Sequence, residues 1–307
     1  MSLPPETNPW FGRLARSKTL PQKLQTFAAL PWKKIMPKSA LMQGLTDPVC
    51  GLNMGRTAEV LAREFRISRE AQDRFALESH RRAVAAQESG RLAKEIAPVY
   101  VPPKYADVVE EDIGPRQQQS LEALAKLRPV FDRRDGTVTA GNACQITDGA
   151  AVVLLASEEW AISQGLTPLV RLRGHATVGL APDRMGLGPA FAIPKALDRA
   201  GVDFDDVSVF EVNEAFAAQV LAVREALASQ RFAEEELGRS RPVGDLDDER
   251  LNPNGGAIAL GHPIGATGAR LVVTLVAELI ERAASFGVAS LCVGGGLGSA
   301  LVMERVR

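Results

Sequence analysis

Short apolar runs alternate with longer helical patterns through the second half of this chain. The apolar runs of strand length are residues 149–156, 207–212, 288–293 and 300–303. A helical pattern begins at about residue 214, and residues 268–284 have the spacing of a strong helix. Strands and helices that alternate in this way bury their apolar side chains in stacked layers. The sequence therefore predicts a layered α/β unit here, with residues 149–156 as a short, fully buried strand.

The first 135 residues have a different pattern. Residues 68–92 form a long helical pattern with Ser68 as a plausible N-cap and Gly90 near its end. Residues 94–118 contain four prolines and no clear strand, and a further helix is expected at residues 120–127. We therefore expect residues 1–135 to form a mostly helical cover outside the layered core.

Residues 7–46 contain seven Lys or Arg side chains and no Asp or Glu, with aromatic side chains between them. Leu20, Leu24, Phe27 and Ala28 recur at helical spacing. One interpretation is a basic amphipathic segment that contacts a membrane surface. The other is a helix with one buried face and one solvated basic face, and periodicity cannot separate the two.

Composition excludes several classes of protein. The chain has 307 residues, 46% hydrophobic and 24% charged, and a formal net charge of −1, which is ordinary for a globular protein and favours no nucleic-acid partner. Its three cysteines are Cys50, Cys144 and Cys292, and its three histidines are His80, His175 and His262. This sparse, scattered set predicts neither a disulfide framework nor a metal site. It suits a reducing compartment, and with no apolar run of spanning length and no signal-peptide layout we expect a cytoplasmic protein.

Two motifs carry polar side chains at places where ligands gather. Asn213, in the run NEAF, stands where a predicted strand ends and a helix begins. Its amide could hold a water or a carbonyl oxygen, or it could simply cap the helix. His262 lies in the run NGGAIALGHPIGATG at 254–268, whose five glycines permit close approach of backbone and substrate. It could be a general base or a structural loop histidine. The run fits neither a phosphate-binding P-loop nor a dinucleotide fingerprint.

The third motif is CVGGGLG at 292–298, at the end of a predicted strand. A thiol at Cys292 beside a run of backbone amides suits acid/base work near an oxyanion. The alternative is a small, buried apolar cysteine.

Together these motifs resemble the C-terminal signature set of the thiolase family. The resemblance runs from about residue 40 to the C-terminus. Further matching stretches are 51–59 (GLNMGRTAE), 67–73 (ISREAQD), 127–131 (LRPVF), 136–142 (GTVTAGN) and 148–150 (DGA). Residues 229–238 and the basic N-terminal stretch look like the fatty-acid-oxidation branch, the 3-ketoacyl-CoA thiolases.

The resemblance implies a 3-ketoacyl-CoA thiolysis, or the reverse Claisen condensation, with coenzyme A as co-substrate and no permanently bound cofactor. It assigns the activation of a nucleophilic cysteine and part of an oxyanion hole to His262, and acid/base work to Cys292. Asn213 would hold a water in that hole, and the N–H of Gly294 would serve a second one. A homo-oligomer, and a partner subunit for fatty-acid β-oxidation, are also expected.

The family's nucleophile lies in a Cys-Ala/Gly-Ser-Gly motif, and this sequence contains no such motif. Neither Cys50 nor Cys144 has that context. We therefore expect a thiolase-like αβα fold whose N-terminal half is largely missing. Residues 1–135 would be the helical insert, 136–165 a remnant of the N-terminal half, and 166–307 the C-terminal domain. One hypothesis is a thiolase completed by a separate or missing N-terminal half, with the isolated chain inactive. The other is a non-catalytic acyl-CoA- or lipid-binding or interaction module.

Overall fold

The computed structural model describes residues 8–29 and 40–306, which fall into two compact units, Met1–Met54 and Gly55–Arg307. The first unit contains the helices α1 (Asn8–Arg16), α2 (Leu20–Ala28) and α4 (Ala40–Gly44). Trp10 is buried between α1 and α2, where its indole N–H donates to the carbonyl oxygen of Thr26 at 2.7 Å. Leu20, Leu24 and Phe27 remain exposed, and α2 has no buried residue. The rest of the basic stretch, residues 30–39, lies outside the described part of the chain.

The second unit begins with helices. They are α5 (Met54–Glu64), α6 (Arg69–Glu88), the 3-10 turn η2 (Leu92–Lys94) and α7 (Leu121–Ala125). Between η2 and α7, the two-residue strands β1 (Val99–Tyr100) and β2 (Val108–Val109) pair with each other. Ser68 caps α6, since its Oγ accepts from the N–H of Ala71 at 3.1 Å, and Ser120 caps α7 in the same way. Both expected helices are therefore confirmed.

The layered core follows. Its strands are β3 (Val170–Gly179), β4 (Val207–Val212), β5 (Phe286–Val293) and β6 (Leu297–Arg305). Its helices and 3-10 turns are α8 (Glu158–Ser163), η3 (Pro182–Leu187), α9 (Gly188–Ala200), η4 (Phe204–Asp206), α10 (Ala217–Ala228), α11 (Gln230–Glu235), α12 (Ala257–Leu260) and α13 (Thr267–Glu281). The strands form one sheet in the order β3-β6-β5-β4, in which only β4 and β5 are parallel.

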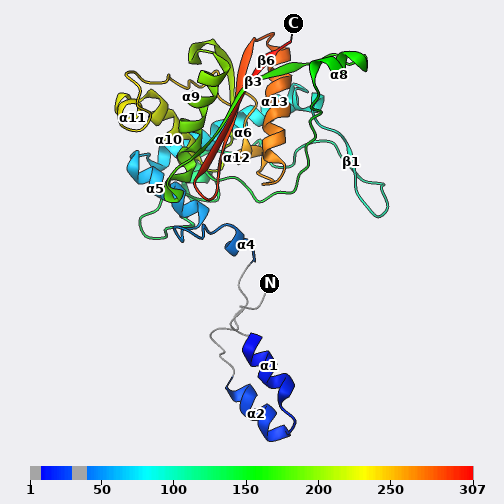
Figure 1. Ribbon diagram of the computed structural model, residues 1–307, viewed down its shortest axis with the longest axis vertical. Helices are drawn as coiled ribbons and strands as arrows, with labels where there is room; N and C mark the ends of the chain where they lie inside the picture. The colour runs from blue at the N-terminus through cyan, green and yellow to red at the C-terminus, as the bar shows by residue number, and fades with distance from the viewer. Residues whose placement is uncertain (1–7, 30–39, 307) are drawn as a thin grey trace. The chain divides into compact units, whose positions relative to one another are not determined.

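Alternating side chains of the strands build a core on each face of the sheet. Phe210, Val212, Val288 and Val302 pack with α9 and α10 on one face. Their neighbours in sequence Val209, Ala289 and Met303 pack with α13 on the other. Figure 1 shows α9 and α13 on either side of the strands. The layered α/β fold class is confirmed.

One expectation about an element is wrong. Residues 149–156 form no strand, and Val152, Leu154 and Leu155 are exposed, because no described strand lies beside them to complete their hydrogen bonds. The helix expected from about residue 214 is α10, which begins at Ala217. Among the described residues, no helix combines the length and apolar character needed to span a membrane.

Candidate active site

Asn213 extends from the carboxyl end of β4 at the edge of the sheet. Its backbone N–H donates to the carbonyl oxygen of Ser290 in β5 at 2.9 Å, which continues the parallel pairing by one residue. Its side chain is fully buried. The N-cap of α10 is Phe216, so the interpretation of Asn213 as a helix cap is wrong. The amide of Asn213 is therefore held in the interior, at the end of a strand.

The glycine-rich loop is fixed to the end of β4 by Asn252. Its Oδ1 accepts from the N–H of Val212 at 2.8 Å, and its Nδ2 donates to the carbonyl oxygen of Val212 at 2.9 Å and to Glu214 at 2.8 Å. Asn252 has a φ of 43°, a conformation that Asn tolerates better than most residues. The Asn252 side chain thus makes the hydrogen bonds to Val212 that a neighbouring strand would otherwise make, and it holds the glycine-rich loop against β4.

His262 lies directly against Asn213. Its Nε2 is 3.4 Å from Nδ2 of Asn213, and its Nδ1 is 2.7 Å from Oγ1 of Thr267 in the first turn of α13. Its backbone N–H donates to Oγ1 of Thr147 at 2.8 Å. Burial lowers the pKa of His262 below its ordinary value, and the positive charge of Arg270 lowers this pKa further. The imidazole is therefore neutral at physiological pH.

Gly261 is required immediately before this histidine. Its φ of +99° is a conformation that side-chain-bearing residues rarely adopt. A Cβ atom at this position would also collide with the side chain of Thr147. The same threonine accepts the N–H of His262, so the close approach of the two loops and the placement of the imidazole depend on each other.

Cys292 lies near the end of β5, the strand beside β4. It is buried, and burial raises the pKa of its thiol to about 12, with a smaller contribution from Cys144. The side chain is therefore a protonated thiol at neutral pH, which can donate a proton but is a poor nucleophile. Gly294 follows in the exposed β5–β6 turn, where Gly295 and Gly296 have positive φ.

The sequence reasoning dismissed Cys144, but the structure places it near these residues. Its N–H donates to the carbonyl oxygen of Ala215 at 3.0 Å, and Ala143 and Phe216 form a β-bridge beside it. Burial raises the pKa of the Cys144 thiol to about 12. Its context in the sequence gave no signal for this position.

Two buried glutamates flank Asn213 in the sequence, Glu214 directly after it and Glu211 two residues before it. Glu214 accepts hydrogen bonds from Ser79 at 2.6 Å, from Asn252 at 2.8 Å and from the N–H of Ile258 at 3.2 Å, and so joins α6, the glycine-rich loop and α12. Glu211 in β4 is fully buried, and burial raises its pKa to about 8. Its nearest cation is Arg270, with Nη1 3.5 Å from Oε2.

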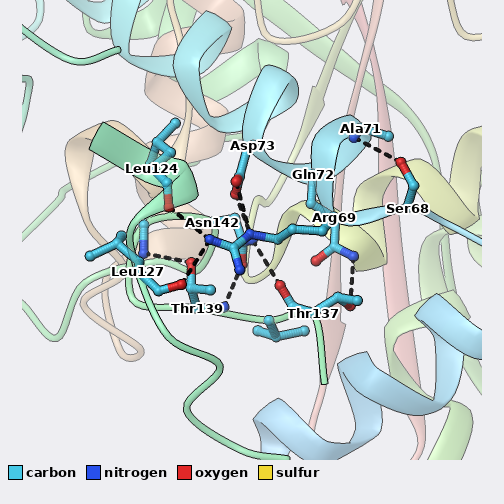
Figure 2. A network of polar contacts seen from close by, with 12 residues as sticks. Ser68, Arg69, Ala71, Gln72, Asp73, Leu124, Leu127, Thr137, Thr139 and Asn142 are labelled. Carbon is cyan, nitrogen blue, oxygen red and sulfur yellow. Dashed lines mark hydrogen bonds and ion pairs between the residues drawn. The ribbon is translucent and has the colours of Figure 1, made fainter. Parts of the chain in front are cut away.

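The segment that carries Cys144 and Thr147 is fixed to α6 through Asn142. Figure 2 shows this network: Asn142 donates to Asp73 at 3.0 Å and accepts from the N–H of Thr139 at 2.7 Å. Asp73 also forms an ion pair with Arg69 at 2.8 Å. Arg69 in turn donates to the carbonyl oxygen of Leu124 in α7 and to that of Leu127, two residues beyond the helix. Asn142 is fully buried, and these hydrogen bonds fix the position from which residues 143–147 continue.

The structure thus brings Asn213 and His262 into contact and places Cys292 on the neighbouring strand end. The roles inferred for these residues and for Gly294 remain predictions. Sequence reasoning missed Thr147 and Thr267, the two hydroxyls that hold His262. Across residues 8–29 and 40–306, no group of His, Cys, Asp and Glu side chains is arranged to hold a metal ion.

Two family models match this chain. The model of the thiolase N-terminal domain matches residues 21–159, and the model of the thiolase C-terminal domain matches residues 166–305. Part of the N-terminal domain sequence is therefore present, although the division of the chain at residues 135 and 165 stays a prediction.

Curated relatives carry the name 3-ketoacyl-CoA thiolase. The protein of Pectobacterium carotovorum subsp. carotovorum (strain PC1) is 45% identical over 290 residues, which are 94% of this chain and 65% of the relative. That of Escherichia coli O157:H7 is 43% identical over 94% of this chain and 66% of the relative. The chain thus spans slightly less than two thirds of the length of these relatives.

Solved structures agree with this match. The Bacillus anthracis acetyl-CoA acetyltransferase is 42% identical with a TM-score of 0.78, over 90% of this chain and 67% of that chain. Human mitochondrial 3-ketoacyl-CoA thiolase in complex with CoA is 42% identical with a TM-score of 0.77, over 87% and 62%. With both domain models matched and this identity over most of its length, the chain belongs to the thiolase family.

Proposed function

We propose that this chain provides the acid/base part of a 3-ketoacyl-CoA thiolase site. The observation that carries the proposal is the contact between Asn213 and His262 at the end of β4, with Cys292 on the adjacent strand end. The names of the curated relatives support the reaction, and the human relative solved with CoA supports coenzyme A as the co-substrate.

The chemistry of these three side chains suits a carbon–carbon cleavage. A thiolate that attacks the 3-keto carbon creates an oxyanion, which needs hydrogen-bond donors that are already in place. When the C2–C3 bond breaks, its electrons form the enolate of acetyl-CoA, and the protonated thiol of Cys292 can supply the proton at C2. Free CoA then attacks the acyl thioester, and its thiol proton returns to Cys292. The neutral imidazole of His262 can accept the proton of the attacking cysteine.

The attacking cysteine is the remaining requirement. The thiols of Cys144 and Cys292 both have a pKa raised to about 12 by burial, which is the wrong direction for a nucleophile. Cys50 lies in the motif PVCGL, which differs from the Cys-Ala/Gly-Ser-Gly motif of the family. We propose that an N-terminal thiolase segment with that motif supplies the nucleophile.

The test is a thiolysis assay with acetoacetyl-CoA and a longer 3-ketoacyl-CoA. Purified, mass-verified chain is assayed alone and after mixing with a separately expressed N-terminal thiolase half. We expect turnover only in the mixture, and a loss of about 10²- to 10⁴-fold when His262→Asn or Cys292→Ala is used. Robust turnover by these 307 residues alone, with an acyl group trapped on Cys50, Cys144 or Cys292, would refute the proposal that the nucleophile lies in an N-terminal thiolase segment. A mixture that binds CoA without turnover would favour the non-catalytic binding module instead.

We also propose that the first unit contacts a membrane surface. In α2 the apolar side chains of Leu20, Leu24 and Phe27 are exposed, and the helix carries no acidic residue. Exposed apolar side chains among cations suit the interface of an anionic bilayer. We expect the full chain to co-sediment with anionic vesicles and Phe27→Glu to abolish this, while Gln25→Glu on the same helix has a smaller effect. Equal losses in both variants would show that charge alone is responsible and would contradict the proposed insertion.

A further inference from the structure

Thr267 has a single hydroxyl proton, and its contacts show where that proton goes. The side chain is fully buried in the first turn of α13. Its Oγ1 is 3.0 Å from the carbonyl oxygen of Pro263, four residues earlier, and 2.7 Å from Nδ1 of His262. A carbonyl oxygen can only accept a hydrogen bond, so the hydroxyl donates to Pro263. Threonine in a helix often donates to the carbonyl oxygen four residues back, alongside the backbone N–H.

The hydroxyl oxygen of Thr267 must therefore accept a hydrogen bond from its other neighbour, His262. At 2.7 Å, Oγ1 and Nδ1 are close enough for a good hydrogen bond, which requires one proton between them. Because the hydroxyl proton is committed to Pro263, that proton belongs to Nδ1 of His262. A neutral imidazole carries only one ring proton, so Nε2 is then left with a lone pair.

The contact at the opposite end of the ring is consistent with this proton position. Nε2 of His262 faces Nδ2 of Asn213 at 3.4 Å, and an amide nitrogen can only donate. A proton on Nε2 would set two donors against each other in a buried place. The chain of contacts from Pro263 through Thr267 and His262 to Asn213 is satisfied by one arrangement of protons.

We infer that Thr267 is a positioning residue that holds His262 in the tautomer protonated at Nδ1, with the Nε2 lone pair directed towards Asn213. Its importance for the reaction rests on the proposed function, because only a base needs a lone pair at Nε2. The tautomer itself does not rest on the proposed function, because the contacts that set it are present in this chain.

His80 provides an internal contrast. It is also buried, and burial lowers its pKa to about 4, so it too is neutral at physiological pH. Its Nδ1 lies 3.2 Å from the backbone N–H of Arg116, which can only donate. The proton of His80 is therefore on Nε2. Two buried histidines of one chain thus have opposite tautomers, each set by the partner of Nδ1.

The experiment measures the tautomers directly. The full chain is labelled with ¹⁵N in histidine, and long-range ¹H–¹⁵N correlations of the ring protons are recorded at about pH 8. With only three histidines in the sequence, His262→Asn and His80→Gln assign the signals. We expect Nδ1–H for His262 and Nε2–H for His80. Thr267→Val should shift His262 away from the Nδ1–H pattern without changing His80, and Thr267→Ser should restore it.

Two results would overturn the inference: an Nε2–H pattern for His262 in the unmodified chain, or an unchanged Nδ1–H pattern in Thr267→Val. If Thr267→Val fails to fold, the unmodified chain alone still decides. As a second readout, Thr267→Val should lower the turnover of the mixture with an N-terminal thiolase half by about 10- to 100-fold, the loss seen when the hydrogen-bond partner of a metal-bound histidine is removed. Thr267→Ser should recover most of it. The spectra need no turnover, so failure of the proposed function cannot be mistaken for failure of this inference.

Discussion

Removing the Asn142 side chain should destabilise the fold without removing any of the proposed catalytic groups. The side chain is fully buried and makes three hydrogen bonds: from the N–H of Thr139 at 2.7 Å, to Asp73 at 3.0 Å and to the carbonyl oxygen of Thr137 at 3.1 Å. Asn142→Ala leaves the buried N–H of Thr139, a buried carboxylate oxygen of Asp73 and the partly buried carbonyl oxygen of Thr137 without these partners. Each unsatisfied group costs about 1–3 kcal/mol, and partial relaxation offsets some of this cost. We expect the free energy of unfolding to fall by about 3–5 kcal/mol.

Asn142→Asp tests the reason for this loss. The new carboxylate keeps the acceptor for Thr139 but sets a second negative charge beside Asp73. Two carboxyl groups this close share one proton, so the folded variant holds a proton that the unfolded chain has released above about pH 4. Its stability is therefore retained in acid and lost as the pH rises. Asn142→Ala should lower the free energy of unfolding by about the same amount at pH 5 and at pH 8.

The assay is urea unfolding followed by circular dichroism and tryptophan fluorescence at pH 5 and pH 8. Gln118→Ala, at an exposed position, is the matched control and should change stability by less than about 0.5 kcal/mol. The reasoning is refuted if Asn142→Ala costs less than about 1 kcal/mol, or if Asn142→Asp is equally destabilised at both pH values.

Three further predictions follow from buried or strained positions. Burial raises the pKa of Glu211 to about 8, so its contribution to the free energy of unfolding is complete below about pH 4.5 and is lost as the pH rises towards 8. Glu211→Gln should therefore flatten the decline of the urea unfolding midpoint between pH 5 and pH 9. An unchanged decline would contradict this prediction. In the same assay, Gly261→Ala should lower the free energy of unfolding by about 2–4 kcal/mol, because it adds strain at a positive φ and a collision with Thr147. Gly268→Ala is the control: there is open space around Gly268, so this change should be neutral or stabilising. In the reconstituted mixture, the acid limb of kcat/KM should lie below pH 6.5, because burial lowers the pKa of His262; a limb at or above that value would argue against His262 as the base.

Local signals in the sequence located several elements accurately. The apolar run 207–212 is β4 at the same residues, and the Ser68 cap starts α6 where expected. The sequence predicted that the three motifs converge at one end of the sheet: β4 and β5 are parallel, so Asn213 and Cys292 lie at the same edge, and the glycine-rich loop brings His262 to Asn213 there. These features depend on short stretches of chain and on a general rule for α/β sheets.

Other features depend on partners far away in the sequence. β3 was missed because its sequence, VRLRGHATVG, mixes charged and apolar residues, and it becomes a strand by pairing with β6 more than 100 residues later. Residues 149–156 have the composition of a strand but lack a neighbouring backbone. Thr267 lies only five residues from His262, yet its contact with Nδ1 depends on how the loop folds back before α13.

The loops of the site share one principle of construction. Each is fixed by a buried polar side chain that bonds to backbone: Asn252 on β4, Asn142 on residues 137–139, and Glu214 on the first turn of α12. These anchors touch none of the reacting atoms assigned above, and none of them is recognisable from residue type alone. A chain could therefore keep His262 and Cys292 and still lose the geometry that makes them a pair of catalytic groups. The motifs identify the chemistry available to this protein, while the anchors determine whether that chemistry is assembled in one place.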